Sequence, residues 1–151
     1  MVLDKYIDKR DNYYKAAGSF FDLGDWLGFE VMKNDNSLLF DCYLVYELEI
    51  MSKVASILGD AGEAAYYEKI RQSRIDFINA HYIDPQTCKT IGAGFGTEQP
   101  SPFGGMFGPK RKGVLIDTQT SYALPLAFGI VKDGYKAKFI ENLFIRSHVR
   151  A

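Results

Sequence analysis

Apolar residues recur every three or four positions along most of this chain, and that period is typical of amphipathic helices. The pattern predicts a first helix over Leu3–Ala17, which Gly18 ends. A second helix is predicted over Leu38–Leu58, after four polar residues that can cap its N-terminus. Apolar positions cover most sides of this second segment, so we expect an inner, buried helix.

Gly59 and Asp60 separate the second helix from a third, which is predicted to reach about Tyr82. Asp60 and Glu63 have the spacing of a capping box at its start. The turn is so short that the two helices must be antiparallel neighbours. The third helix has a narrower apolar stripe and a charged back, so we expect it to be an outer helix.

The segment Ile83–Asp117 is rich in glycine and proline and is therefore predicted to be irregular. Cap residues follow it, and a fourth helix is predicted over Tyr122–Val131. Pro125 suits the first turn of that helix if Thr120 or Ser121 is the cap, and kinks the helix if Asp117 is the cap. A fifth helix follows a short turn and presents one apolar face: Tyr135, Phe139, Leu143 and Val149.

Long and short connections alternate between these five predicted helices. If consecutive helices are antiparallel, the two long loops, 18–37 and 83–121, lie at one end, and the two tight turns lie at the other. Functional residues concentrate in long loops on a rigid scaffold. The N-termini of both inner helices point to the same end and favour oxyanions or polarised hydroxyls. This candidate face holds Asp25, Trp26, Glu30, Asp117, Gln119 and Thr120.

Gly24-Asp25-Trp26 places a carboxylate beside the only tryptophan of the chain. A carboxylate accepts hydrogen bonds from hydroxyls, and an indole face packs on the C–H face of a sugar, so the pair suits a polyhydroxylated ligand. Alternatively, Trp26 fills the core and Asp25 caps the next helix. Both interpretations are open at this point.

Composition narrows the class of partner. The net charge of −1 gives no general reason to expect nucleic acid or an acidic membrane surface. No apolar run approaches the ~20 residues of a membrane span, and the N-terminus lacks the apolar core of a signal peptide, so we expect a cytoplasmic protein. Cys42 and Cys88 are far apart and have no clustered histidines, so no metal site is expected. Gly92-Ala-Gly-Phe-Gly96 follows no predicted strand, so no nucleotide cofactor is expected either.

Three stretches carry a resemblance to a known family: the FxxGDWL loop, the segment from Ala55 to Ile75, and Asp117-Thr-Gln-Thr-Ser-Tyr-Ala-Leu124. Together they resemble the catalytic domain of bacterial α-L-rhamnosidases, (α/α)6 toroids of six helical hairpins that hydrolyse terminal α-L-rhamnose with inversion. The resemblance implies an all-α fold of antiparallel helical hairpins. It further implies that residues 1–151 form a single domain, a fragment of such a toroid.

The same resemblance implies a carbohydrate substrate contacted by Asp25 and Trp26, with Trp26 lining the pocket for the sugar in the −1 position, and by Gln119 and Thr120 near the same rim. In the family the general acid lies upstream of the Gly-Asp-Trp loop and the general base lies downstream of the segment matched here. No catalytic residue is therefore nominated, and the isolated chain is expected to be inactive. An exposed apolar face is expected to bind either a second copy or the remainder of the catalytic domain.

Other classes of protein share some of these features. Ala55–Ile75 also looks like a tetratricopeptide unit, which would make the chain a helical-repeat interaction module, but no 34-residue period is present. Another six-hairpin sugar enzyme, such as a trehalase or an unsaturated glucuronyl hydrolase, is a further alternative. The Asp-Thr-Gln-Thr stretch favours a rhamnosidase over these enzymes.

Overall fold

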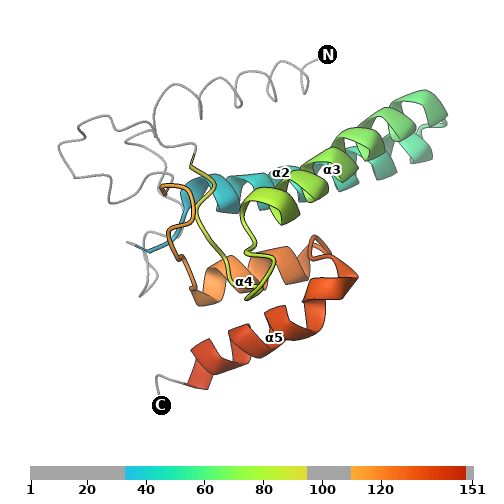
Figure 1. The fold of residues 1–151 in the computed structure, drawn as a ribbon. Helices are drawn as coiled ribbons and strands as arrows, with labels where there is room; N and C mark the ends of the chain where they lie inside the picture. Colours follow the sequence, from blue (N-terminus) through green and yellow to red (C-terminus); the bar gives the residue numbers. More distant parts are fainter. Residues whose placement is uncertain (1–32, 95–109, 149–151) are drawn as a thin grey trace.

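The computed structural model describes residues 33–94 and 110–148, which form two antiparallel helical hairpins (Figure 1). The first hairpin pairs α2 (Asn36–Ile57) with α3 (Ala61–His81), and the second pairs α4 (Gln119–Ala127) with α5 (Asp133–His148). Helices account for 67% of the described residues, which contain no strands. The predicted all-α fold is confirmed, whereas the first predicted helix lies outside the described residues.

The turn between α2 and α3 is a Schellman motif, as the position of Gly59 suggested. The Gly59 N–H donates to the carbonyl of Ser56 at 3.1 Å, and the Asp60 N–H donates to that of Ala55 at 2.9 Å. The Asp60 carboxylate then caps α3 by accepting from the Glu63 N–H at 2.9 Å. Only this half of the predicted capping box forms, because the Asp60 N–H is already bonded to Ala55.

Helix α4 differs from the predicted Tyr122–Val131. It begins at Gln119 because Thr118 is the N-cap, so none of the three caps considered for Pro125 is used, and the proline lies inside the helix. It ends at Ala127 because a second Schellman motif follows, with Gly129 at φ 66°. In that motif the Ile130 N–H donates to the Pro125 carbonyl at 2.8 Å.

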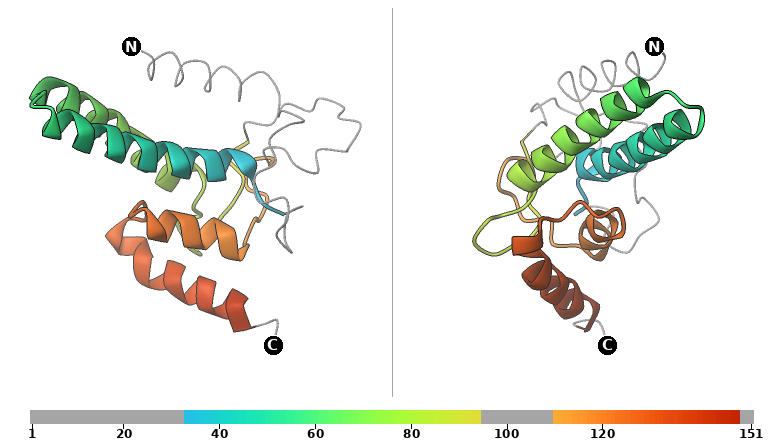
Figure 2. Two further views of the ribbon diagram at one scale, coloured as in Figure 1. Left: turned by 180° about the vertical axis from the view of Figure 1, so that it is seen from behind. Right: turned by 90° about the vertical axis from the view of Figure 1, so that its right-hand side faces the viewer.

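The two tight turns are not level with each other, although both had been expected at the far end. Helix α4 has 9 residues whereas α2 has 22, which correspond to roughly 14 Å and 33 Å. The turn after α4 therefore reaches only the C-terminal part of α3, where Asn79 donates to the Ile130 carbonyl at 2.7 Å. As a result, the α2–α3 hairpin projects beyond the α4–α5 hairpin (Figures 1 and 2).

The core lies between the N-terminal half of α2, the C-terminal half of α3 and the segments that lead to α4. Helix α4 lies between the first hairpin and α5, while α3 is an outer helix, as predicted (Figure 2). Phe139 on α5 is fully buried against Tyr122, with their ring centroids 4.8 Å apart. The main buried cluster consists of Leu38, Cys42, Val45, Ile75, Ile78, Tyr82, Ala93, Ile116 and Ile130.

Helix α2 is less buried than its sequence predicted. The expected inner helix leaves one apolar stripe open from Tyr43 to its C-terminus, with exposed fractions from 42% at Ile50 and Val54 to 83% at Ile57. The difference arises because α4 is too short to cover the C-terminal half of α2. The exposed apolar residues of α2 and its C-cap are Tyr43, Tyr46, Ile50, Val54, Ile57 and Leu58.

The turn at Gly59 provides a test of the left-handed conformation that joins α2 to α3. Gly59 has φ 80° and open space where a Cβ would lie. We expect Gly59→Ala to lower the free energy of unfolding by about 1 kcal/mol through backbone strain alone. Gly134→Ala in the first turn of α5 is the matched control, because that glycine also has open space but no positive φ. Urea denaturation of both variants should show a loss only for Gly59→Ala, and equal stabilities would contradict the assignment.

Candidate functional site

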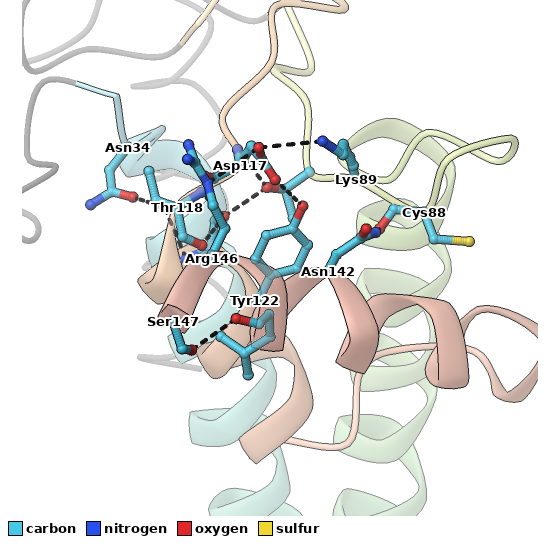
Figure 3. Close-up of polar contacts among 12 residues, drawn as sticks. Asn34, Cys88, Lys89, Asp117, Thr118, Tyr122, Asn142, Arg146 and Ser147 are labelled. Atoms are coloured by element: carbon cyan, nitrogen blue, oxygen red, sulfur yellow. Dashed lines mark hydrogen bonds and ion pairs between the residues drawn. The ribbon is translucent and has the colours of Figure 1, made fainter. Parts of the chain in front are cut away.

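The described parts of both long loops meet where α2 and α4 begin. The segments 83–94 and 110–118 are irregular, as predicted, and are linked by isolated pairings of Ile83 with Thr90 and of Ile91 with Leu115. The Lys110 N–H donates to Asp35 at 2.9 Å, and the Thr118 hydroxyl donates to the Asn34 side chain (Figure 3). For the described residues, the predicted convergence of the loops at one end is therefore confirmed.

Asp117 is the centre of the polar contacts at this end (Figure 3). Its Oδ1 accepts a hydrogen bond from the Tyr122 hydroxyl at 2.5 Å. Its Oδ2 lies 3.2 Å from Arg146 Nε and 3.5 Å from Lys89 Nζ. Arg146 also donates to the Asp117 carbonyl. A buried carboxylate is stable only when it is paired and hydrogen-bonded, and these three side chains supply both kinds of partner.

A chain of hydroxyls ties the start of α4 to the preceding loop. The Asp117 N–H donates to Thr90 Oγ1 at 3.1 Å, and that oxygen lies 2.7 Å from Ser121 Oγ. Thr118 and Ser121 form a complete capping box. Asp117 itself has φ 49°, a left-handed conformation that aspartate tolerates better than most residues. These contacts together fix the direction in which the chain enters α4.

Helix α5 holds the other side of the same loop. Asn142 and Arg146 are four residues apart and therefore lie on one face of the helix. The Asn142 amide donates to the carbonyls of Thr87 and Cys88, each at 3.0 Å. Sequence reasoning missed Lys89, Asn142 and Arg146. For Asn142 and Arg146, the available signal was their helical spacing on α5, beside the apolar face that contains Phe139.

Burial shifts the pKa values of several groups at this end. The pKa of Tyr122 is raised mainly by burial and also by its hydrogen bond to Asp117, so its hydroxyl remains a donor. Burial also raises the pKa of the Asp35 carboxyl, although hydrogen bonds from Ser37 and Lys110 oppose the shift. Burial lowers the pKa of Lys110, and the charge of Asp35 partly offsets that change. The N-terminus of α2 therefore contains a carboxylate that is costly to ionise.

The four residues predicted to bind substrate fall into two groups. Gln119 is exposed and Thr120 is half-buried, and both lie in the first turn of α4 directly after the Asp117 contacts. Asp25 and Trp26 lie outside the described residues, as does Glu30, so the expected meeting of the two groups stays a prediction. Asp117, the remaining residue of the candidate face, is buried among its own partners.

Two further observations concern only residues 33–94 and 110–148. Within these ranges, no His, Cys, Asp and Glu side chains gather into a group that could hold a metal ion. Within the same ranges, none of the helices combines the length and the hydrophobicity that crossing a membrane requires.

Its antiparallel helical hairpins and the loops at their polar end place this chain in the class of all-α hairpin domains. Comparison with protein-family models adds the family itself. Residues 2–149 match the bacterial alpha-L-rhamnosidase 6 hairpin glycosidase domain, so the chain belongs to this family. No curated protein and no solved structure matches the chain. Membership in a glycosidase family implies a carbohydrate substrate.

The hydrogen bond from Tyr122 to Asp117 can be tested by removing one oxygen. We expect Tyr122→Phe to lower the free energy of unfolding by about 1–3 kcal/mol, because it leaves a buried carboxylate oxygen without its donor. Tyr43→Phe removes the same group at a site that is 47% exposed and should change stability by less than about 0.5 kcal/mol. Chemical denaturation of both variants measures the difference, and similar effects would show that the hydrogen bond contributes little.

The raised pKa of Asp35 has a consequence for stability. The folded protein binds this proton more tightly than the unfolded chain does, so ionisation of Asp35 opposes folding. Its favourable contribution is complete below about pH 4 and is lost as the pH rises through the folded pKa. We therefore expect the free energy of unfolding of the wild type to fall, relative to Asp35→Asn, as the pH rises from about 4 through the folded pKa.

Denaturation curves across this pH range measure that difference for Asp35→Asn. The same comparison of the wild type with Asp76→Asn is the control for general effects of an aspartate substitution, because Asp76 is exposed. The raised pKa would be contradicted if the difference in free energy of unfolding between the wild type and Asp35→Asn did not change with pH. It would also be contradicted if the wild type became relatively more stable as the pH rises.

Proposed function

We propose that this chain is part of a glycoside hydrolase that removes terminal α-L-rhamnose with inversion of configuration. The observation that carries the proposal is the family match over residues 2–149. The convergence of both loop segments at the N-termini of α2 and α4 supports it, because this end is where long loops can present residues to a ligand. The tight Schellman turns close the opposite ends of the hairpins.

The first turn of α4 offers groups suited to sugar hydroxyls. The Gln119 amide and the Thr120 hydroxyl each donate and accept hydrogen bonds. They follow Asp117 and Thr118 directly, so the contacts of Asp117 with Lys89 and Arg146 hold this turn in place. In the proposed site Asp25 accepts from sugar hydroxyls and Trp26 packs against the sugar ring.

Acid–base catalysis in the proposed reaction needs two carboxyl groups roughly 6.5–9.5 Å apart, with space for a water molecule. Asp35 and Asp117, which are buried in the described part of this end, do not suit that role. Asp117 is engaged by Tyr122, Lys89 and Arg146, and Asp35 is occupied as the cap of α2. We propose that the catalytic pair comes from family segments that flank this stretch, and that this chain supplies substrate contacts.

Titration with L-rhamnose tests the substrate contacts, because the single tryptophan makes intrinsic fluorescence a specific reporter of Trp26. We expect a saturable change with L-rhamnose and none with D-glucose at equal concentration. By calorimetry, Trp26→Ala should weaken binding by about 1–3 kcal/mol and leave the circular dichroism spectrum unchanged. Loss of the fold in Trp26→Ala would instead support a core position for this side chain.

Hydrolysis of p-nitrophenyl α-L-rhamnoside by the same sample tests the second part of the proposal. No enzyme-like turnover is expected without the catalytic pair. Turnover by this chain would show that its own carboxylates perform the chemistry, and Asp25, Glu30 and Asp117 would then be the first to replace. Equal responses to rhamnose and glucose would contradict the proposed sugar.

A further inference from the structure

Two residues of the long loop adopt a backbone conformation that is uncommon for any residue except glycine. Among the described residues, Cys88 and Asp117 are the non-glycine residues with positive φ, at 52° and 49°. An aspartate side chain compensates for this conformation by local hydrogen bonding, whereas a cysteine side chain does not. Such conformations persist only where the surrounding structure enforces them, and they concentrate at functional sites. The contacts that enforce them here therefore bear on function.

One face of α5 supplies a contact of this kind to both residues. The Asn142 amide donates to the Cys88 carbonyl at 3.0 Å, and Arg146 donates to the Asp117 carbonyl (Figure 3). Asn142 is buried, so its amide is committed to the loop. Both donors hold a backbone carbonyl, and they are one helical turn apart on α5. Helix α5 therefore clamps the two strained residues of the loop from the same side.

The loop segments beside these two carbonyls converge on the first turn of α4. Thr90, two residues after Cys88, accepts from the Asp117 N–H at 3.1 Å and lies 2.7 Å from Ser121 Oγ. Lys89 Nζ lies 3.5 Å from Asp117 Oδ2. A displacement of the backbone at Cys88 or at Asp117 therefore reaches the same turn of α4.

We propose that Asn142 and Arg146 are positioning residues for the sugar site. Through the two strained carbonyls they fix the first turn of α4, which presents Gln119 and Thr120 to the ligand. The inference rests on the proposed function, because it takes Gln119 and Thr120 as sugar contacts. Hydrogen bonds depend steeply on distance and angle, so a small shift of this turn weakens the contacts with the sugar.

The affinity of alanine variants for L-rhamnose, measured by calorimetry, tests this role. Asn142→Ala and Arg146→Ala should each raise the Kd by about threefold to tenfold, the equivalent of one hydrogen bond to the ligand. Asn79→Ala is the matched control, because this buried amide also donates to two backbone carbonyls but lies at the turn after α4. The control should lower the free energy of unfolding and leave the Kd unchanged.

A loss of stability must be separated from a change of position. A partly folded variant has an apparent Kd that is raised by the reciprocal of its folded fraction. The titrations are therefore made at a temperature at which circular dichroism shows that every variant is folded. Under that condition a merely structural role of the two α5 residues does not change the Kd.

A second substitution tests whether Asn142 acts through the strained carbonyl. Glycine adopts positive φ without strain, so Cys88→Gly should keep the loop conformation even when the Asn142 amide is absent. Added to Asn142→Ala, Cys88→Gly should return the Kd toward the wild-type value. Added to Arg146→Ala, it should not, because Arg146 holds the carbonyl of Asp117.

Several outcomes would overturn this inference and leave the proposed function in place. One is a wild type that binds L-rhamnose with a Kd that both α5 variants retain. Others are an equal loss of affinity in Asn79→Ala, the failure of both α5 variants to fold, or the failure of Cys88→Gly to restore binding. A wild type that does not bind L-rhamnose would instead contradict the proposed function, and this inference with it.

Discussion

The contact between Asp117 and its partners is the interaction on which the arrangement of the two hairpins depends. The carboxylate joins three parts of the chain: Lys89 from the long loop, Tyr122 from α4 and Arg146 from α5. A buried carboxylate is costly without its partners, so the three segments are positioned together or not at all. Asn142 extends the contact to the carbonyls of Thr87 and Cys88. The first turn of α4 is presented at a defined place because its entry is held from both sides.

Two glycines determine the shape of the opposite side of the molecule. Gly59 and Gly129 both adopt positive φ and close Schellman motifs, which stop α2 and α4 after very different lengths. The difference in length leaves the tip of the α2–α3 hairpin without a neighbour among the described helices. The same local chemistry that makes both turns tight therefore also produces the exposed apolar stripe.

The polar end and the apolar stripe divide the surface by chemistry. At the polar end, Asp35, Asp117 and Thr118 are engaged in caps and ion pairs, and the first turn of α4 carries the exposed Gln119. This is the arrangement expected of a scaffold that positions a few substrate contacts on rigid elements. Membership in the glycosidase family implies a carbohydrate substrate. Among the described residues, Asp35 and Asp117 are both engaged by their own partners, which limits the role proposed for this end.

The sequence by itself determined the class of fold and, for the described residues, the order of the helices. Helical periodicity, the caps at Asp35 and Asp60 and the stop at Gly59 are local signals, because each depends on residues within one or two turns. The motif around residues 117–124, together with the FxxGDWL loop and the segment from Ala55 to Ile75, indicated the family. The predicted start of α4 was wrong because several residues between Asp117 and Ser121 qualify as caps. The contacts of Thr118 with Ser121 and Asn34 select Thr118.

Tertiary structure alone decided which apolar residues are buried and which polar residues meet. The apolar stripe of α2 has the same local pattern whether or not a helix covers it, so its exposure depended on the length of a different element, α4. The grouping of Lys89, Asp117 and Arg146 joins positions far apart in the chain, and no spacing rule connects them. Local sequence specifies hydrogen bonds within a helix or turn, whereas burial and ion pairing depend on how separate elements pack, and for that reason only the folded chain shows them.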